Sequence, residues 1–272
     1  MSLVVSKDLA LRLEDSEIEA LSSRLKEIQK RQGNPMNVEM HKFGNATAFS
    51  VKNIPGPSFN TVKGLTERDV EQIDQIIEFY RQKEIPVRFE LAPASSSPEL
   101  LTYLSEAGYY QNDFHTTLYA SLSNQLETSF EIKEPKITIC ELKRDEFDTF
   151  AEIYTKGFQM PSFLKNGVEQ NNEILYNNTD WTFYLASYES EPVGVGTLFT
   201  NNGVASLAAA TTVPNFRNKG IHSALIKHRI YQAKLRKCDL IVGQANFGSV
   251  SQNNMERAGM KIAYTKAIWV KK

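Results

Sequence analysis

The sequence has 272 residues and a formal net charge of −1. At roughly 100–200 residues per domain this length favours two domains, and the near-zero charge argues against a nucleic-acid-binding or membrane-surface protein. No apolar run reaches the roughly 18 residues that a membrane-spanning helix needs, and the N-terminus does not resemble a signal peptide. Two isolated cysteines, Cys140 and Cys238, predict a reducing, cytoplasmic setting.

Helical and strand patterns alternate through the first half. Ser16-Glu17-Ile18-Glu19 fits a capping box, and apolar residues then recur at helical spacing, which predicts a helix over 16–31. The further predictions are strand material at 37–51, a loop at 53–60, a helix over 67–82, a strand at 87–91, a short helix over 98–109 and a strand at 114–122.

The second half repeats this order after a polar segment. Residues 123–136 contain Pro135 and little helical pattern, so we predict a linker there between a domain at 1–122 and a domain at 137–272. The predicted elements are a strand at 136–142, a helix over 144–158, paired strands at 181–189 and 193–200, a strand at 203–213, a helix over 218–237, a strand at 239–245, a short helix over 251–260 and a strand at 261–270.

The two halves can be aligned with each other. YLSEAGY (103–109) matches NMERAGM (254–260), and VRFELAP (87–93) matches LIVGQAN (240–246). Because the period is close to the size of a domain, the repeat indicates duplication of a whole α/β domain rather than a solenoid.

The predicted helix over 218–237 begins without an acidic residue, although a helix N-terminus favours negative charge. Arg217 and Lys219 stand there instead, and Gly220 lets a ligand approach the backbone. Unpaired backbone N–H groups at such a helix start bind pyrophosphate, so we expect a ligand to supply the missing charge. Other phosphate motifs fit less well: no Walker motif occurs, and Gly194-Val195-Gly196 lacks the third glycine and lies in a strand pattern.

The segment Val213-Pro214-x-x-Arg217-x-Lys219-Gly220-Ile221-His222 resembles the acyl-CoA loop of GNAT-type N-acetyltransferases, whose usual form is Arg/Gln-x-x-Gly-x-Gly/Ala. The later segments DLIVGQAN and SQNNMERAGM are similar to the next strand and short helix of that family. The resemblance covers about 137–272, and the first half resembles the degenerate first repeat of two-domain members. It implies an α/β (α+β) fold of two tandem GNAT-like domains, each with a mixed, mostly antiparallel sheet flanked by helices.

The resemblance also implies a site for acetyl-CoA as co-substrate, without a metal ion. Backbone groups at the end of the strand at 203–213 would pair with the pantetheine arm. The N–H groups that follow would hold the pyrophosphate with help from two cations, and two later asparagines would contact the arm. The residues implied to bind the cofactor are Thr212, Val213, Arg217, Asn218, Lys219, Gly220, Ile221, His222, Asn246 and Asn254.

Departures from the family pattern leave the catalytic residues unassigned. His222 stands where the family has a small residue, and we expect an exposed first-turn side chain there. Met255 stands where many relatives have a tyrosine acid, and a methionine cannot donate a proton. The strand at 204–213 also lacks the glutamate base of some relatives. The candidates by residue type alone are Tyr184, Asp180, Glu173 and His115.

The first half is expected to lack a cofactor. In the internal alignment Gly220 falls opposite Glu67, within Leu65-Thr66-Glu67-Arg68-Asp69. Two carboxylates would repel a pyrophosphate there. The carboxylates of Glu67 and Asp69 instead supply negative charge to the N-terminus of their own helix, and Thr66 caps it.

The sequence therefore predicts an N-acetyltransferase in which a primary amine of a small molecule or peptide attacks the thioester directly. A backbone N–H near Val213 would stabilise the oxyanion. The alternative is a CoA-binding sensor or assembly module without turnover, which Met255 favours. Nucleic-acid binding by the basic segment 217–237 is disfavoured by the net charge and by the lack of interleaved aromatic residues. The acceptor and the oligomeric state stay open.

Overall fold

The computed structural model describes residues 4–54, 56–122 and 134–272, and its contacts group them into two compact units. The N-terminal unit comprises Val4–Thr117, Ala245–Phe247 and Ile262–Lys272. The C-terminal unit takes its described residues from Leu118–Gln244 and Gly248–Lys261. The last strand of the chain therefore belongs to the unit built from the first half. The predicted division of the sequence into domains at 1–122 and 137–272 stays a prediction. Most of the predicted linker at 123–136 lies outside the described residues.

The N-terminal unit is a mixed sheet with the strand order β1-β2-β3-β4-β11-β5. Within it β3 and β4 are parallel, whereas β1–β2, β2–β3 and β4–β11 are antiparallel. Its elements are α1 (Lys7–Gln29), β1 (Val38–Phe43), β2 (Ala46–Val51), β3 (Thr61–Lys63), α2 (Ile73–Arg81), β4 (Arg88–Leu91), α3 (Pro98–Glu106), β5 (Tyr109–Ser121, of which the part to Thr117 lies in this unit) and β11 (Lys261–Lys271).

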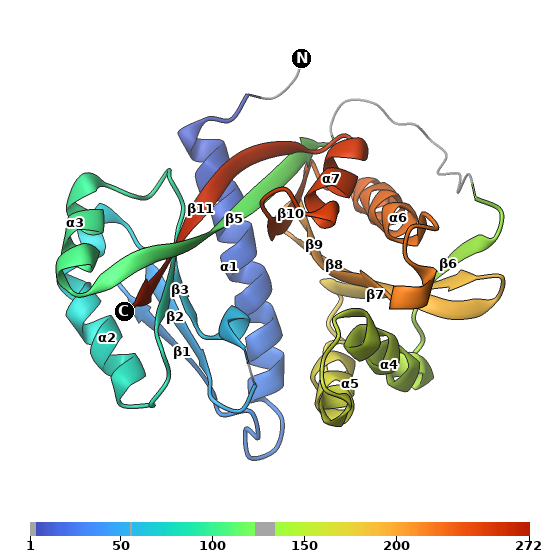
Figure 1. Cartoon of the computed structure of the whole chain (residues 1–272), viewed down its shortest axis with the longest axis horizontal. Coiled ribbons are helices and arrows are strands. Elements are labelled where there is room, and N and C mark those ends of the chain that lie inside the picture. Colours follow the sequence, from blue (N-terminus) through green and yellow to red (C-terminus); the bar gives the residue numbers. More distant parts are fainter. Residues whose placement is uncertain (1–3, 55, 123–133) are drawn as a thin grey trace. The chain divides into compact units, whose positions relative to one another are not determined.

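Helices cover both faces of this sheet (Figure 1): α2 and α3 lie on one face and α1 on the other. Successive strand residues point to opposite faces, so each strand feeds two cores. In β2, Ala48 packs in the cluster that includes α2 and α3, whereas its neighbour Phe49 packs in the cluster that includes α1. Both residues are fully buried.

The first helix begins earlier than predicted. Ser6 caps α1, since its side-chain oxygen accepts a hydrogen bond from the N–H of Leu9 at 3.2 Å. Ser16 lies inside the helix and donates its hydroxyl to the Leu13 carbonyl at 2.7 Å. The predicted capping box at Ser16 is therefore wrong, because a capping sequence is not a cap where the helix is already under way.

The C-terminal unit has the strand order β10-β9-β8-β7-β6, with the end of β5 beside β10. Within it β9 and β10 are parallel, whereas β6–β7, β7–β8 and β8–β9 are antiparallel. Its elements are β6 (Ile137–Glu141), α4 (Phe147–Gly157), α5 (Lys165–Glu173), β7 (Trp181–Tyr188), β8 (Glu191–Asn201), β9 (Val204–Thr212), α6 (Ile221–Leu235), β10 (Leu240–Asn246) and α7 (Val250–Arg257).

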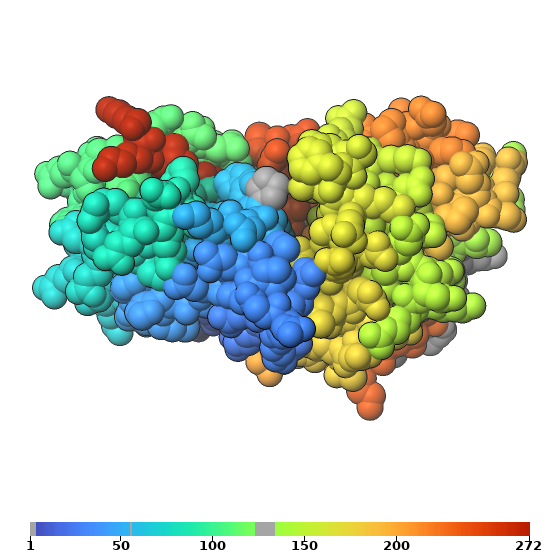
Figure 2. All heavy atoms as spheres, turned by 90° about the horizontal axis from the view of Figure 1, so that it is seen from below, coloured from blue at the N-terminus to red at the C-terminus, as the bar shows by residue number. Residues whose placement is uncertain are grey.

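Helices again cover two faces: α4 and α5 lie on one side of β7–β9, and α6 and α7 lie on the other (Figure 1). Figure 2 shows the α4–α5 segment in yellow-green at the molecular surface seen from below. Helix α5 was not predicted, because its sequence KNGVEQNNE has almost no apolar residue with which to mark a period. The mixed α/β fold predicted for this half is confirmed.

Two irregularities of β9 open the sheet. Its parallel pairing with β10 runs from Val204–Leu240 to Leu207–Gly243 and ends there. Its antiparallel pairing with β8 shifts register between Gly196 and Leu198. Such a shift marks a β-bulge, which bends the strand and redirects its side chains. The second part of β9 thus diverges from β10, and this opening positions the candidate site.

Candidate active site

Helix α6 starts without a cap. Its N-cap residue is Gly220, whose φ of 84° lies in the left-handed region that favours glycine, and no described side chain caps the first turn. That turn contains no acidic residue. The two charged side chains just before it are Arg217 and Lys219, so the positive end of the helix dipole has no counter-charge of its own.

The backbone N–H groups from Asn218 to Ser223 indicate an anion-binding site. In the described part of the chain no protein acceptor is recorded for them, whereas the N–H of Arg217 is bonded to the Pro214 carbonyl and that of Ala224 to the Gly220 carbonyl. Asn218 itself has a φ of 63°, a left-handed conformation that Asn tolerates well. A run of unpaired N–H groups at a helix start is a typical anion-binding arrangement.

The two predicted cations have partners within the protein. Arg217 donates through Nη2 to the Gly157 carbonyl at 2.8 Å and through Nε to the Thr212 carbonyl at 3.5 Å. Its guanidinium thereby joins the loop to the end of α4. The ammonium of Lys219 lies 4.6 Å from the ring centre of Tyr188 and 4.7 Å from that of Phe216. Such cation–π contacts hold Lys219 against aromatic rings.

A cavity of about 240 Å³ lies where β9 leaves β10. Its walls come from α4, β9, β10, α6 and α7, and none of the residues that line it carries a carboxylate. The lining residues are Tyr154, Phe158, Leu207, Ala208, Ala209, Ala210, His222, Ile226, Arg229, Gln244, Ser251 and Met255. Mostly apolar walls with a few polar groups are typical of ligand pockets.

Arg229 is the only permanently charged residue in this lining, and the sequence analysis missed it. Its side chain is 1% exposed and donates to the carbonyls of Leu225, Thr197 and Ala209 at 3.1, 3.0 and 3.2 Å. Burial lowers the pKa of Arg229 to about 10. The available signal was its place four residues after the buried Leu225 on the apolar face of α6.

His222 is turned toward α7 rather than toward solvent. Its Nδ1 lies 3.1 Å from Nδ2 of Asn254, and the side chain is half-buried, so the prediction of an exposed residue is wrong. Burial, assisted by Arg229, lowers the pKa of His222 to about 4. The structure thus brings two predicted site residues together that are far apart in the sequence. Asn246 is exposed at the end of β10 and groups with the N-terminal unit.

The strand end before the loop offers a hydroxyl rather than the expected N–H. The N–H of Val213 donates to the Val193 carbonyl at 2.9 Å, so it is not available as an oxyanion donor as we had expected. The side-chain oxygen of Thr212 is buried and has no hydrogen-bond partner among the described residues. A buried polar atom of this kind is rare unless a ligand or water satisfies it.

The residues proposed by type for catalysis do not gather at the cavity. Glu173 forms an ion pair with Arg144 at 3.2 Å, and His115 belongs to the N-terminal unit. Neither these two nor Tyr184 or Asp180 is among the residues that line the cavity. Met255, in contrast, lines it and is 3% exposed.

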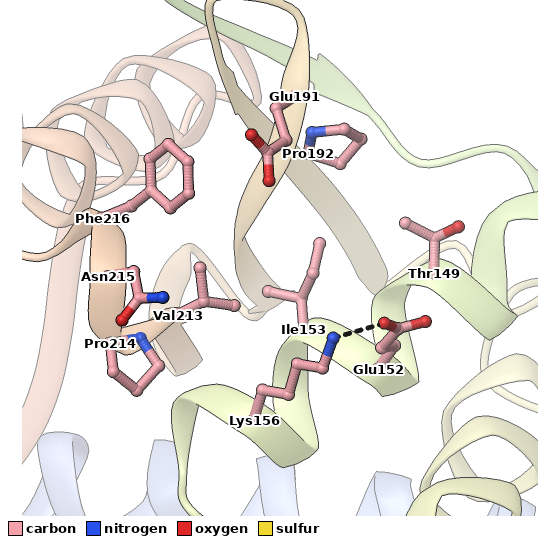
Figure 3. A pocket seen from close by; sticks show the side chains of 10 residues that line it. All are labelled: Thr149, Glu152, Ile153, Lys156, Glu191, Pro192, Val213, Pro214, Asn215 and Phe216. Carbon is pink, nitrogen blue, oxygen red and sulfur yellow. Dashed lines mark hydrogen bonds and ion pairs between the residues drawn. The ribbon is translucent and has the colours of Figure 1, made fainter.

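A second hollow, of about 540 Å³, lies between α4, the start of β8 and the loop residues Val213–Phe216. Figure 3 shows its side chains, including the ion pair between Lys156 and Glu152 at 2.6 Å and the carboxylate of Glu191. Two carboxylates make this hollow less suitable for phosphate groups than the N–H groups at the start of α6.

The equivalent region of the N-terminal unit is closed by its own side chains. Thr66 caps the turn at Glu67–Gln72 and forms a capping box with Asp69, which confirms the predicted cap. Beside it, β3 and β4 pair at Val62 and Phe89. The next residues on these strands, Lys63 and Glu90, form a buried ion pair. Carboxylates and an ion pair thus replace the free N–H groups and the opening of the other unit.

The comparison with known families agrees with this geometry. A family model described as the acetyltransferase (GNAT) family matches residues 145–255, which include β9, the loop, α6 and β10. This segment belongs to the GNAT acetyltransferase family. The family resemblance predicted from the loop motif is confirmed. No curated protein matches the sequence.

Several solved structures, two of them described as GNAT proteins, share the fold of the chain. A GCN5-related N-acetyltransferase from Kribbella flavida is 12% identical with a TM-score of 0.68, over 97% of this chain and 95% of that chain. A tandem GNAT protein from the clavulanic acid biosynthesis pathway is 10% identical with a TM-score of 0.63, over 99% and 97%. A functionally unknown conserved protein from Staphylococcus epidermidis ATCC 12228 is 14% identical with a TM-score of 0.63, over 87% and 94%. These likenesses show the fold, and they confirm the predicted tandem form.

Proposed function

We propose that the chain is an N-acetyltransferase that moves an acetyl group from acetyl-CoA to a primary amine of a small molecule or peptide. The observation that carries the proposal is the start of α6. Six successive N–H groups there, for which the described part of the chain offers no acceptor, lie next to an opened pair of parallel strands. Membership of residues 145–255 in an acetyltransferase family supports it.

The residues present fit acetyl-CoA. The N–H groups from Asn218 to Ser223 suit its pyrophosphate, and Gly220 leaves their approach open. The orphaned hydroxyl of Thr212 and the cavity beside Ala208–Ala210 suit its amide-containing arm. Arg217 and Lys219 add a positive field but keep their protein partners. When bound, acetyl-CoA supplies a thioester whose carbonyl carbon takes the amine nitrogen, while the C–S electron pair passes to sulfur and the amine proton to water.

Asn218→Asp tests this site with little change in shape. A carboxylate at the start of α6 favours the helix dipole, so the fold should not suffer. The same charge repels a pyrophosphate held by the neighbouring N–H groups. We expect acetyl-CoA to bind at least about tenfold more weakly in a calorimetric titration, which corresponds to about 1.4 kcal/mol.

Asn215→Asp is the matched control, because it places the same charge three residues earlier, beside the second hollow. It should bind acetyl-CoA nearly as the wild type does. Equal weakening in both variants would indicate only a long-range charge effect. Unchanged binding in Asn218→Asp would show that the anion site is not at the start of α6.

The second candidate function is a CoA-binding module without turnover. The buried Met255 favours it, because the cavity has no proton donor at that position. The two functions differ in release of free CoA thiol from acetyl-CoA in the presence of a panel of primary amines. Transfer that depends on an amine supports the enzyme, and stoichiometric binding without release from any amine supports the module.

A further inference from the structure

The contact between His222 and Asn254 fixes the protonation of the imidazole. Nη1 of Arg257 lies 3.2 Å from Oδ1 of Asn254, and a guanidinium can only donate. The oxygen of the Asn254 amide therefore faces Arg257, and its NH₂ group faces Nδ1 of His222. An amide NH₂ only donates, so Nδ1 must be the acceptor.

It follows that His222 is neutral and carries its proton on Nε2. A protonated ring would place N–H against N–H at the Asn254 contact. The lowered pKa of His222 agrees with a neutral ring at pH 7. No second hydrogen bond of His222 is recorded within the described residues, and the side chain lines the cavity between β9, α6 and α7. The ring thus has one unused donor and no charge.

The surroundings of this donor decide what it suits. Arg229 on α6 lines the same cavity, Arg257 on α7 contacts Asn254, and no residue of the cavity lining carries a carboxylate. A neutral N–H lacks the charge that strengthens a bond to phosphate. It matches a neutral carbonyl oxygen, because a single donor among mostly apolar walls fixes the orientation of a polar group that enters.

We propose that His222 is a recognition residue for the pantetheine arm of CoA, to which it donates Nε2–H at an amide carbonyl. Asn254 is a positioning residue, since it holds the tautomer that makes this donor. The inference rests on the proposed function, because it places CoA in the same site. It adds a contact by the side chain that stands where the family motif has a small residue.

Two variants with side chains of similar length test the Nε2–H donor of His222. His222→Met removes it, and His222→Gln retains an N–H donor. Each is titrated by calorimetry with CoA and with adenosine 3′-phosphate 5′-diphosphate. The second compound carries the three phosphates of CoA but lacks the pantetheine arm. We expect His222→Met to bind CoA about 3- to 10-fold more weakly, as for the loss of one neutral hydrogen bond. We expect His222→Gln to stay within about twofold of the wild type, and both to bind the diphosphate as the wild type does.

The outcomes separate the inference from the proposed function. Equal losses for CoA and for the diphosphate would place His222 at the phosphates and overturn the inference. Unchanged CoA binding in His222→Met would also overturn it, while leaving the proposed function intact. Failure of the wild type to bind CoA would overturn both.

Asn254→Asp tests the tautomer. A carboxylate beside Nδ1 draws a proton to that nitrogen and raises the pKa of His222. In the wild type, histidine NMR resonances should show a neutral Nε2–H ring from pH 6 to 8, and CoA affinity should not follow its titration. In Asn254→Asp, the ring should titrate at higher pH than in the wild type. A wild-type ring with its proton on Nδ1 would contradict the proposal.

Discussion

At the scale of single residues, the N-terminal unit contains a buried network of opposite charges. Lys266 on β11 contacts Glu17 on α1 and lies 3.0 Å from Glu90 on β4. Lys63 on β3 lies 3.6 Å from Glu17 and is also paired with Glu90. The network joins four elements. Breaking a buried pair from one side costs far more than breaking an exposed pair, because it leaves an uncompensated charge.

Lys266→Met should therefore destabilise the protein strongly. The change leaves Glu17 and Glu90 with one cation fewer, and we expect a loss of about 3–5 kcal/mol in the free energy of unfolding. Urea denaturation measures this loss. The control is Lys30→Met, which removes an exposed pair with Glu27 and should have little effect. Similar effects of the two variants would show that the network is not buried in solution.

The same network predicts a loss of stability in acid. Burial by itself raises the pKa of Glu90, but Lys63 and Lys266 outweigh it and hold that pKa well below the ordinary 4.5. A carboxyl with a lowered folded-state pKa stabilises the fold above the unfolded-state pKa and loses this contribution as the pH falls toward the folded-state value. Glu14, whose pKa burial raises, acts in the opposite direction. The free energy of unfolding should fall as the pH drops below about 4.5, and a flat urea-denaturation profile there would contradict this.

At the scale of elements, the bulge in β9 is hydrogen-bonded by Arg229 of α6. Its guanidinium binds the carbonyls of Thr197 on β8 and Ala209 on β9, where the two strands shift register. Gly196 makes room for it, since a Cβ there would lie 3.2 Å from Nε of Arg229. We infer that this brace holds open the strand that forms one wall of the cavity.

Arg229→Met should remove the guanidinium donor from those carbonyls and lower the free energy of unfolding by about 3 kcal/mol. Gly196→Ala should lower it by about 1–3 kcal/mol through crowding of the same guanidinium. Lys227→Met, on the exposed face of α6, is the control and should change little. Guanidinium denaturation gives all three values. If Arg229→Met left the free energy of unfolding unchanged, the bulge would not need the hydrogen bonds from Arg229.

Local signals predicted most of the elements, and non-local contacts explain what they missed. The cap at Thr66 and the start of α6 at Gly220 are visible in the sequence because both depend on neighbouring residues. The true start of α1 was missed because Ser16 resembles a cap only out of context. β3 was missed because three residues are too few to show a period.

The candidate site divides in the same way. The loop motif revealed the N–H groups from Asn218 onward, because a helix start without a cap is a local property. It did not reveal that Arg217 and Lys219 are held by a carbonyl and by aromatic rings. The pair His222–Asn254 spans two helices, so no local pattern could have predicted it. The same holds for the assignment of β11 to the unit of the first half.

At the scale of the whole molecule, no helix among the described residues is both long and apolar enough to cross a membrane.

The two units differ in the regions that the internal alignment makes equivalent. The C-terminal unit keeps an uncapped helix and an opened strand pair, whereas the N-terminal unit fills both with Thr66, Asp69 and the Lys63–Glu90 pair. We therefore propose one acyl-CoA site per chain rather than two.

The most direct test of this claim is the number of acetyl-CoA molecules bound per chain, measured by equilibrium dialysis with labelled acetyl-CoA at saturating concentration. We predict one equivalent for the wild type and its loss in Asn218→Asp, because the only anion site proposed lies at the start of α6. Two equivalents, or one that persists in Asn218→Asp, would contradict the account. No binding to the wild type would show that the chain has the GNAT fold without its cofactor site.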